Sequence, residues 1–143
     1  MNDLDIYFRN NPLLKECVDD LHAQIFSYES SIAKKAIFYN MVTLTDWGKV
    51  DWTKINNKIY VGCNSELIIP SLQKLLNNND FDKKVCIIWS DPGSRAIETS
   101  LDAVIKNFDS VTCVAPEKFI FNPTQGYIIE IRTGDDTTVG VIK

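Results

Sequence analysis

Apolar positions in the first part of the chain recur at helical spacing. After Pro12, four apolar residues keep the i, i+4, i+7, i+11 spacing that places them on one face of a helix. They are Leu14, Val18, Leu21 and Ile25. Residues 30–44 begin with similar spacing but become rich in strand-favouring residues from Phe38 onward. The pattern therefore predicts a helix from Pro12, and then a helix or turn that gives way to extended chain near Phe38.

The middle of the chain alternates strand-like and helix-like runs. Residues 45–57 look irregular, and a short strand is expected at residues 58–63. A helix is expected from Ser65, whose hydroxyl can cap it, with Pro70 marking a boundary or a kink. The continuous apolar run at residues 84–90 predicts a buried strand. A turn at residues 91–94 then leads into a third expected helix, whose inward face is Ala96, Ile97, Leu101, Val104, Ile105 and Phe108.

The last part of the chain has the pattern of a meander. Four short apolar runs alternate with turn-forming residues and leave no room for a helix. The expected strands are residues 111–115, 119–121, 127–131 and 138–142. The whole pattern predicts one α+β, or mixed α/β, domain over residues 1–143. Its core is a central mixed sheet with a C-terminal antiparallel meander, and about three helices pack on it.

The same C-terminal block carries a family resemblance. Its order is C-V-A-P-E-K-F-I-F-N-P from Cys113, G-Y-I-I-E from Gly126, an acidic turn, and T-V-G-V-I from Thr138. This order resembles the C-terminal part of small immunity proteins from bacterial contact-dependent growth inhibition systems. The resemblance implies a cytoplasmic protein that binds the C-terminal domain of a cognate toxin, most often a nuclease, and neutralises it. No set of contact residues comes with the resemblance.

The charge balance favours a basic partner. The chain has 15 Lys and Arg against 19 Asp and Glu, which gives a net charge of −4 and a pI of about 4.9. A protein that grips a phosphate backbone needs a concentrated basic surface, so direct binding of nucleic acid is not expected. No apolar run reaches the roughly 18 residues of a membrane-spanning helix, and the N-terminus lacks a secretion-signal pattern. We therefore expect a cytoplasmic protein that does not associate with membranes.

Residues that could carry catalysis or bind a metal are few. The four cysteines, Cys17, Cys63, Cys86 and Cys113, are widely spaced in apolar surroundings, which predicts reduced, buried thiols and no zinc site. His22 is the single histidine and is expected in mid-helix near the inward face, packed rather than catalytic. These residues lead us to predict no enzyme, no cofactor and no metal.

The turn Asp91–Arg95 is the basis of an alternative function. If a helix follows it, backbone N–H groups and Arg95 could seat a phosphate, as in a small cytosolic enzyme or a nucleotide- or phosphate-binding domain. The simpler interpretation is that Ser90 or Asp91 caps the helix and Pro92 occupies its first position. No glycine-rich nucleotide-binding motif occurs in the sequence, so this function ranks second.

Candidate partner-binding residues follow from charge and position. Residues 46–52 contain Asp-Trp twice, and an exposed Trp beside a carboxylate suits a basic partner; alternatively, both indoles pin the loop to the core. The adjacent acids at 135 and 136 lie between two expected strands, where a solvated hairpin tip is the simpler interpretation. Glu130 and Arg132 alternate with apolar residues, which indicates an outward polar face. The candidate contact residues are Asp46, Trp47, Asp51, Trp52, Asp91, Asp135 and Asp136.

Overall fold

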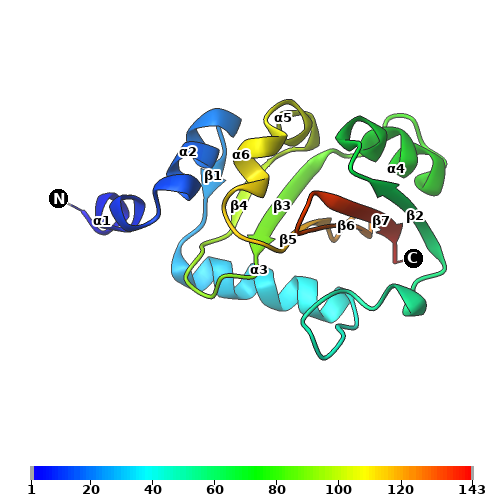
Figure 1. Ribbon diagram of the computed structural model, residues 1–143, viewed down its shortest axis with the longest axis horizontal. Helices are drawn as coiled ribbons and strands as arrows, with labels where there is room; N and C mark the ends of the chain where they lie inside the picture. Colours follow the sequence, from blue (N-terminus) through cyan, green and yellow to red (C-terminus); the bar gives the residue numbers. More distant parts are fainter. Residues whose placement is uncertain (1, 143) are drawn as a thin grey trace.

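The computed structural model, which describes residues 2–142, is built around one seven-stranded sheet (Figure 1). Each strand pairs antiparallel with its neighbours. In spatial order the strands are β1 (Gln24–Ile25), β4 (Ile97–Ser100), β3 (Lys84–Trp89), β5 (Lys118–Asn122), β6 (Tyr127–Arg132), β7 (Asp136–Val141) and β2 (Asn57–Gly62). The predicted α+β class is confirmed. The parallel pairs that a mixed sheet would contain do not occur among the described strands.

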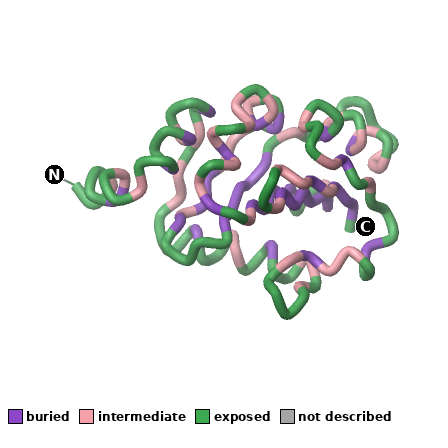
Figure 2. Tube along the Cα trace, viewed as in Figure 1, coloured by how far each residue is buried: buried purple, intermediate pink, exposed green. Residues whose placement is uncertain are grey.

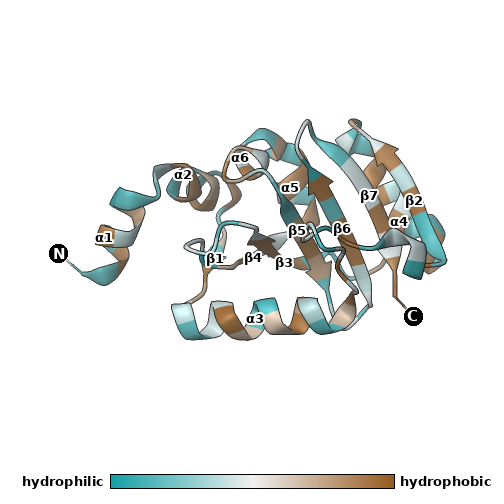
Figure 3. Cartoon of the chain, turned by 60° about the horizontal axis from the view of Figure 1, so that its bottom comes forward, coloured by the Kyte–Doolittle hydropathy of each residue, from teal (hydrophilic) through white to brown (hydrophobic). Residues whose placement is uncertain are grey.

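Helices cover both faces of this sheet. Four helices pack on one face, and their bounds are α2 (Pro12–Leu21), α4 (Ile68–Leu76), α5 (Leu101–Lys106) and α6 (Phe108–Thr112). A further helix, α1 (Asp3–Asn10), extends beyond the edge of the sheet next to α2, and its Tyr7 joins the same core (Figure 1). The other face is covered by α3 (Tyr28–Met41) and by the loop that follows it (Figure 3). Two short 3₁₀ turns, η1 (Trp52–Lys54) and η2 (Ser65–Leu67), precede β2 and α4.

The central strands are buried on both sides, which explains their continuous apolar sequence. Along β3, Ile87 and Trp89 join the core on the side of α2, α4, α5 and α6, whereas Cys86 and Ile88 join the core under α3. In Figure 2 the buried residues concentrate in the central strands, and most exposed residues lie in the surrounding helices and loops. On the α3 side, the ring of Phe38 packs against Phe119 at a centroid distance of 4.9 Å. A strand sandwiched in this way has no solvent face, so the alternation of apolar and polar residues disappears.

The helical predictions in the first half are largely confirmed. The helix from Pro12 is α2, although Ile25 lies beyond it in β1. The expected change to extended chain near Phe38 is wrong, since α3 continues to Met41 and Phe38 is its main contact with the sheet. The irregular segment and the strand before residue 63 are confirmed. The expected cap at Ser65 is wrong: the side chain of Asn64 accepts a hydrogen bond from the backbone N–H of Glu66 and caps η2, and α4 then begins after Leu67 without a side-chain cap.

The expected third helix is wrong in its first half. Ile97 belongs to β4, which pairs with β3, and the helix starts only at Leu101. The reason is local, because the Ser100 hydroxyl caps α5 by accepting from the N–H of Ala103. The expected strand at residues 111–115 is also wrong, since Val111 is buried on α6. The three later strands of the meander are confirmed as β5, β6 and β7.

The expected packing of His22 and of two cysteines needs correction. His22 does not lie in mid-helix but follows α2 as an exposed residue in the left-handed conformation, with φ of 49°. All four thiols are free. Burial raises the pKa of Cys17 and Cys86 to about 12, as expected for packed thiols. Cys63 and Cys113 are exposed, because each follows the end of its element rather than lying within it.

Lys118 is a buried cation at the start of β5. Lys118 is only 2% exposed, and its Nζ donates a hydrogen bond to the carbonyl of Pro116 at 3.0 Å. None of the ion pairs among the described residues includes it. Burial lowers the pKa of Lys118, and the nearby charges of Asp135 and Glu117 offset this only in part. A protonated Lys118 therefore lowers the free energy of unfolding.

We expect Lys118→Met to raise the free energy of unfolding at neutral pH. The folded-state pKa of this lysine lies below its unfolded-state value, so the wild type is penalised while the amine is charged in both states. The penalty fades as the pH rises through the folded-state pKa toward the unfolded-state value. The advantage of the variant over the wild type should shrink accordingly. Urea denaturation at several pH values measures the difference in unfolding free energy between variant and wild type. Lys74→Met, at an exposed lysine, is the control. A difference that stays constant with pH would contradict this prediction.

Candidate partner-binding surface

Strand register brings several carboxylates to one end of the sheet. Trp89 of β3 lies beside Lys118 of β5, which lies beside Ile131 of β6, which in turn lies beside Thr137 of β7. The residues just beyond this row therefore share one edge. They are Asp91, Glu117, Asp135 and Asp136, and we call them the acidic edge.

Glu117 has a buried carboxylate oxygen that lacks a hydrogen-bond partner. Its backbone carbonyl accepts from the N–H of Ser90 at 3.1 Å, which holds the strand ends together. Its Oε1 lies 4.0 Å from Lys49 Nζ, while Oε2 is buried without a hydrogen-bond partner. Glu117 was not among the candidates from sequence, because a single acid before a strand carries no distinctive signal.

The loop between α3 and β2 folds over the sheet beside this edge. Leu44 and Val50 form an antiparallel bridge, and the N–H of Thr45 donates to the carbonyl of Lys49 at 2.7 Å. Gly48 completes the turn with φ of +75°, a conformation that favours glycine. The tip of this small hairpin is Asp46-Trp47-Gly48, and all three residues are exposed. We call residues 46–48 the loop tip.

A buried carboxylate anchors the base of the loop. Glu130 is 1% exposed. It accepts from Val50 N–H at 2.8 Å, from Trp52 Nε1–H at 2.9 Å and from Arg132 Nε–H at 2.9 Å. The interpretation of Glu130 as part of an outward polar face is therefore wrong. The loop covers that face of β6 and supplies the donors that a buried carboxylate needs.

The two tryptophans of the loop have different roles. Trp52 is half-buried, and its indole N–H is bound by Glu130; a Cβ at Gly140 of β7 would lie 2.6 Å from its ring, so the ring packs directly on that strand. Trp47 is 88% exposed. The interpretation that the indoles pin the loop thus holds for Trp52 and fails for Trp47. An exposed indole of this kind is a candidate binding anchor.

The side chain of Asp51 forms hydrogen bonds within the loop. Its side chain accepts from the N–H of Thr53 at 3.2 Å and from the Thr53 hydroxyl at 2.5 Å, which caps η1. The hydroxyl hydrogen bond from Thr53 lowers the pKa of Asp51. The carboxylate is exposed but already engaged, so Asp51 offers less to a partner than Asp46 does.

The β6–β7 hairpin carries the adjacent pair of acids. Asp135 sits at the tip with φ of 62°, and Thr137 donates its hydroxyl to the Asp135 carbonyl at 3.0 Å. Asp136 begins β7 and accepts a hydrogen bond from the hydroxyl of Tyr60 on β2. This bond, and the charge of Asp136, raise the pKa of Tyr60. Tyr60 is 68% exposed, so an aromatic ring stands beside the acidic edge; sequence alone gave no reason to select it.

Comparison with known families decides the class of protein. A family model described as CdiI immunity protein EcoliA0-like matches residues 11–140. The chain belongs to this family. It is an immunity protein of a bacterial contact-dependent growth inhibition system, as the C-terminal resemblance implied. Membership of this family implies a cognate toxin as partner. No curated protein matches the chain. The match assigns no contact residues, so the candidate contact residues remain predictions.

In this immunity protein the turn Asp91–Arg95 does not form an anion site. The Asp91 carboxylate accepts from the N–H of Gly93 at 3.0 Å and from the Ser94 hydroxyl at 3.1 Å. The chain then enters β4, so no helix N-terminus follows. The guanidinium of Arg95 stacks between Tyr7 and Tyr28, at 5.0 and 5.2 Å from their ring centres, and its Nε donates to the Phe26 carbonyl. Asp91 remains part of the acidic edge, but its carboxylate is occupied by hydrogen bonds within its own turn.

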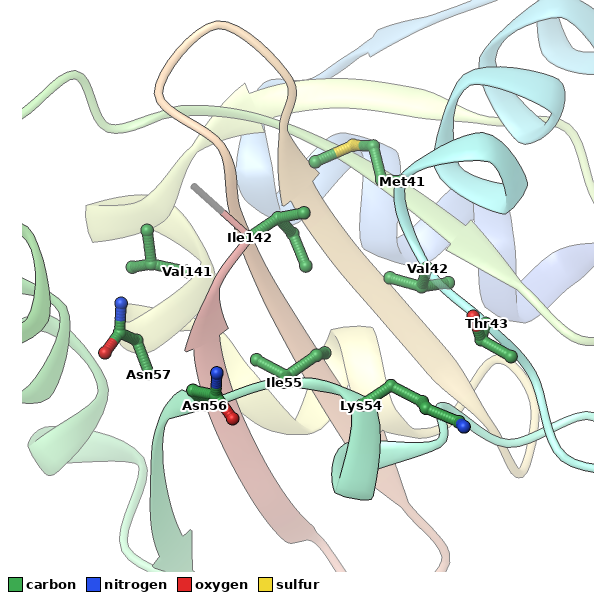
Figure 4. Close-up of a pocket in the computed structure, with 9 residues that line it drawn as sticks. All are labelled: Met41, Val42, Thr43, Lys54, Ile55, Asn56, Asn57, Val141 and Ile142. Carbon is green, nitrogen blue, oxygen red and sulfur yellow. The ribbon is translucent and has the colours of Figure 1, made fainter.

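The immunity protein also has a cavity of about 230 Å³ at the opposite end of the sheet. It lies between the end of α3 and the start of β2 (Figure 4). Its lining residues are Met41, Val42, Thr43, Lys54, Ile55, Asn56, Asn57, Val141 and Ile142. Lys54 is the single charged group among them, so no acid–base pair converges there. Within residues 2–142, no cluster of His, Cys, Asp and Glu could hold a metal ion, and no helix has the length and apolar character to cross a membrane.

Proposed function

We propose that this immunity protein neutralises its toxin by covering the toxin's active or substrate-binding surface with the acidic edge and the loop tip. The toxin would be a basic C-terminal domain, and a nuclease. The immunity protein would act in the cytoplasm by binding alone, without catalysis. The observation that carries the proposal is the convergence of carboxylates from three strand ends beside an indole that is 88% exposed.

Charge gives the proposal its physical basis. A nuclease holds phosphates with basic side chains, and the carboxylates of the acidic edge could lie where those phosphates would lie. Lys118 is buried, and Arg132 is paired through Nε with Glu130. Lys49 lies 4.0 Å from Glu117 and offsets part of the negative charge. An acidic surface also speeds association, which matters for an inhibitor that must bind before the toxin acts.

The loop tip would supply affinity that charge alone does not. Trp47 offers a large, rigid apolar surface, and Asp46 beside it can pair with a basic residue of the toxin. The anchor at Glu130 holds the base of the loop, so the loss of conformational entropy on binding is small. By contrast, the alternative function at Asp91–Arg95 has no support from geometry, because the arginine and the backbone N–H of Gly93 already have partners within the chain.

The decisive experiment uses the toxin encoded next to this gene. Its C-terminal domain should co-purify with the immunity protein and stop growth when expressed alone, and co-expression of the immunity protein should restore growth. A purified toxin domain that degrades nucleic acid, and stops doing so when the immunity protein is added, would support the nuclease assignment. Failure of the two proteins to bind would refute the proposal.

Neutralising charge at the proposed surface should slow association. We expect Asp46→Asn with Asp135→Asn to reduce the association rate by about 3- to 10-fold at low salt, and less at high salt, because steering is screened. Asparagine tolerates the positive φ at position 135, so the fold should be unaffected. Stopped-flow binding at several salt concentrations measures this effect. The matched control, Glu16→Gln with Asp80→Asn, changes the net charge equally at exposed residues elsewhere, and an equal loss in that control would contradict a local effect.

A further inference from the structure

Among the described residues of helix α1, only Tyr7 is buried. The helix lies at the end of the molecule farthest from α4 and β2 (Figure 1). The family model matches residues 11–140, so the match begins after this helix. A helix that buries a single side chain adds little to the core. The contacts of Tyr7 therefore indicate what α1 contributes to the rest of the chain.

The hydroxyl of Tyr7 binds the backbone of the turn between β3 and β4. It donates to the Gly93 carbonyl at 3.2 Å and accepts from the backbone N–H of Arg95 at 2.7 Å. Burial raises the pKa of Tyr7, so the hydroxyl keeps the proton that it donates. Both contacts lie just after Asp91 in the chain, and Asp91 belongs to the acidic edge. One side chain from α1 thus fixes the backbone that follows this carboxylate.

Helix α3 binds the same turn from a second direction. Lys35 Nζ donates to the Ser94 carbonyl at 3.0 Å, and the Ser31 hydroxyl accepts from the backbone N–H of Ala96 at 2.9 Å. A surface connection is ordinarily among the more mobile parts of a fold. Because side chains of two helices bind the backbone of this one, the turn is ordered before any partner arrives.

The same contacts separate Arg95 from Asp91. The guanidinium of Arg95 stacks between the rings of Tyr7 and Tyr28, and its Nε donates to the Phe26 carbonyl at 2.7 Å. None of the ion pairs within residues 2–142 includes Arg95. An arginine so close in sequence could otherwise pair with Asp91 and cancel its charge. Asp91 is exposed, and a carboxylate has about four acceptor sites, so it can still meet a cation besides its two bonds within the turn.

We propose that Tyr7 is a positioning residue for toxin binding, which holds Asp91 in place on the acidic edge and keeps Arg95 away from it. This inference rests on the proposed function, because it takes the acidic edge as the toxin surface. A charge at a fixed position binds a partner without the loss of conformational entropy that a mobile turn would suffer. Helix α1 thus contributes to toxin binding without touching the toxin.

Tyr7→Phe tests the role of the hydroxyl. The variant keeps the ring that stacks on Arg95 but removes both hydrogen bonds to the turn. We expect amide exchange at Arg95 to accelerate at least about tenfold in the full chain without toxin. The toxin domain should bind about 3- to 10-fold more weakly, because the loosened turn must be ordered on binding. Hydrogen exchange and calorimetric titration measure the two effects.

Tyr127→Phe is the matched control. Tyr127 is fully buried at the end of β6 away from the acidic edge, and its hydroxyl donates to the Asp82 carbonyl at 2.8 Å. The control loses the same chemical group, so its melting temperature should fall while its toxin affinity stays at the wild-type value. If Tyr7→Phe also kept wild-type affinity, or if both variants lost affinity equally, the proposal would be wrong.

A double-mutant cycle tests whether Tyr7 acts through Asp91. Asp91→Asn should weaken toxin binding by itself, and Tyr7→Phe should weaken it little further in that background. An equal effect of Tyr7→Phe in both backgrounds, or an Asp91→Asn variant with wild-type affinity, would overturn the proposal. The two proposals fail differently. A wild type that does not bind the toxin refutes both, whereas a toxin that binds wild type and Tyr7→Phe equally well refutes only the role of Tyr7.

Discussion

We expect Trp47→Ala to bind the toxin about 30-fold more weakly than wild type, a loss of about 2 kcal/mol. The indole is 88% exposed in the free protein, so its removal takes away surface that a partner would bury and leaves the core unchanged. The melting temperature should therefore match that of wild type. Since a buried apolar anchor acts mainly after encounter, the loss should appear as faster dissociation. Surface plasmon resonance gives both rate constants.

The control for this experiment is Ile6→Ala. Ile6 is 45% exposed on α1, away from the loop tip, and its truncation should leave toxin affinity unchanged. A Trp47→Ala variant with wild-type affinity would place the toxin on a different surface. A variant with lowered affinity and a lowered melting temperature would instead show that Trp47 supports the fold.

Glu130→Ala should be the most destabilising change at the site. It removes the acceptor for three N–H groups, including the buried amide of Val50. We expect a loss of about 3 kcal/mol of unfolding free energy, which corresponds to a fall of about 8 °C in melting temperature for a chain of this size. Amide exchange at Val50 should accelerate more than exchange at Ile120 in the sheet centre, because the base of the loop loses its anchor first.

Two further variants sharpen this prediction. Glu130→Gln keeps one acceptor oxygen but turns an amide donor toward the remaining N–H groups, so it should cost less than Glu130→Ala but remain measurable. Glu66→Gln, at an exposed carboxylate in η2, should change the stability little. Thermal and urea denaturation measure all three. Equal stability of Glu130→Ala and wild type would show that the loop is held by its apolar contacts alone.

Periodicity in the sequence located the elements whose partners are close along the chain. The apolar spacing after Pro12 identified α2, and turn residues separated β5, β6 and β7 correctly. It failed where short apolar runs could form either structure. Ile97 and Val111 have similar apolar neighbours, yet one pairs with β3 and the other packs from a short helix. Only the packing of the whole sheet decides between these outcomes.

The candidate surface was predictable in part for a similar reason. Composition selected the Asp-Trp repeat, but nothing in the sequence distinguishes Trp47, which is exposed, from Trp52, which Glu130 holds. Glu130 alternates with isoleucines as an exposed strand residue would, and its burial depends on a loop some 80 positions earlier in the chain. Asp135 and Asp136 were identified from their turn. Their closeness to Glu117 follows from strand register, which no local pattern reveals.

The attachment of the loop by its base has a consequence for how toxin specificity can change over time. Glu130 accepts hydrogen bonds from Val50 and Trp52, whereas residues 46–48 are exposed and do not contribute to the core. Substitutions at Asp46 or Trp47 therefore carry little penalty for folding. A lineage facing an altered toxin could explore new recognition chemistry at these positions while the scaffold stays intact, with Gly48 retained to close the turn.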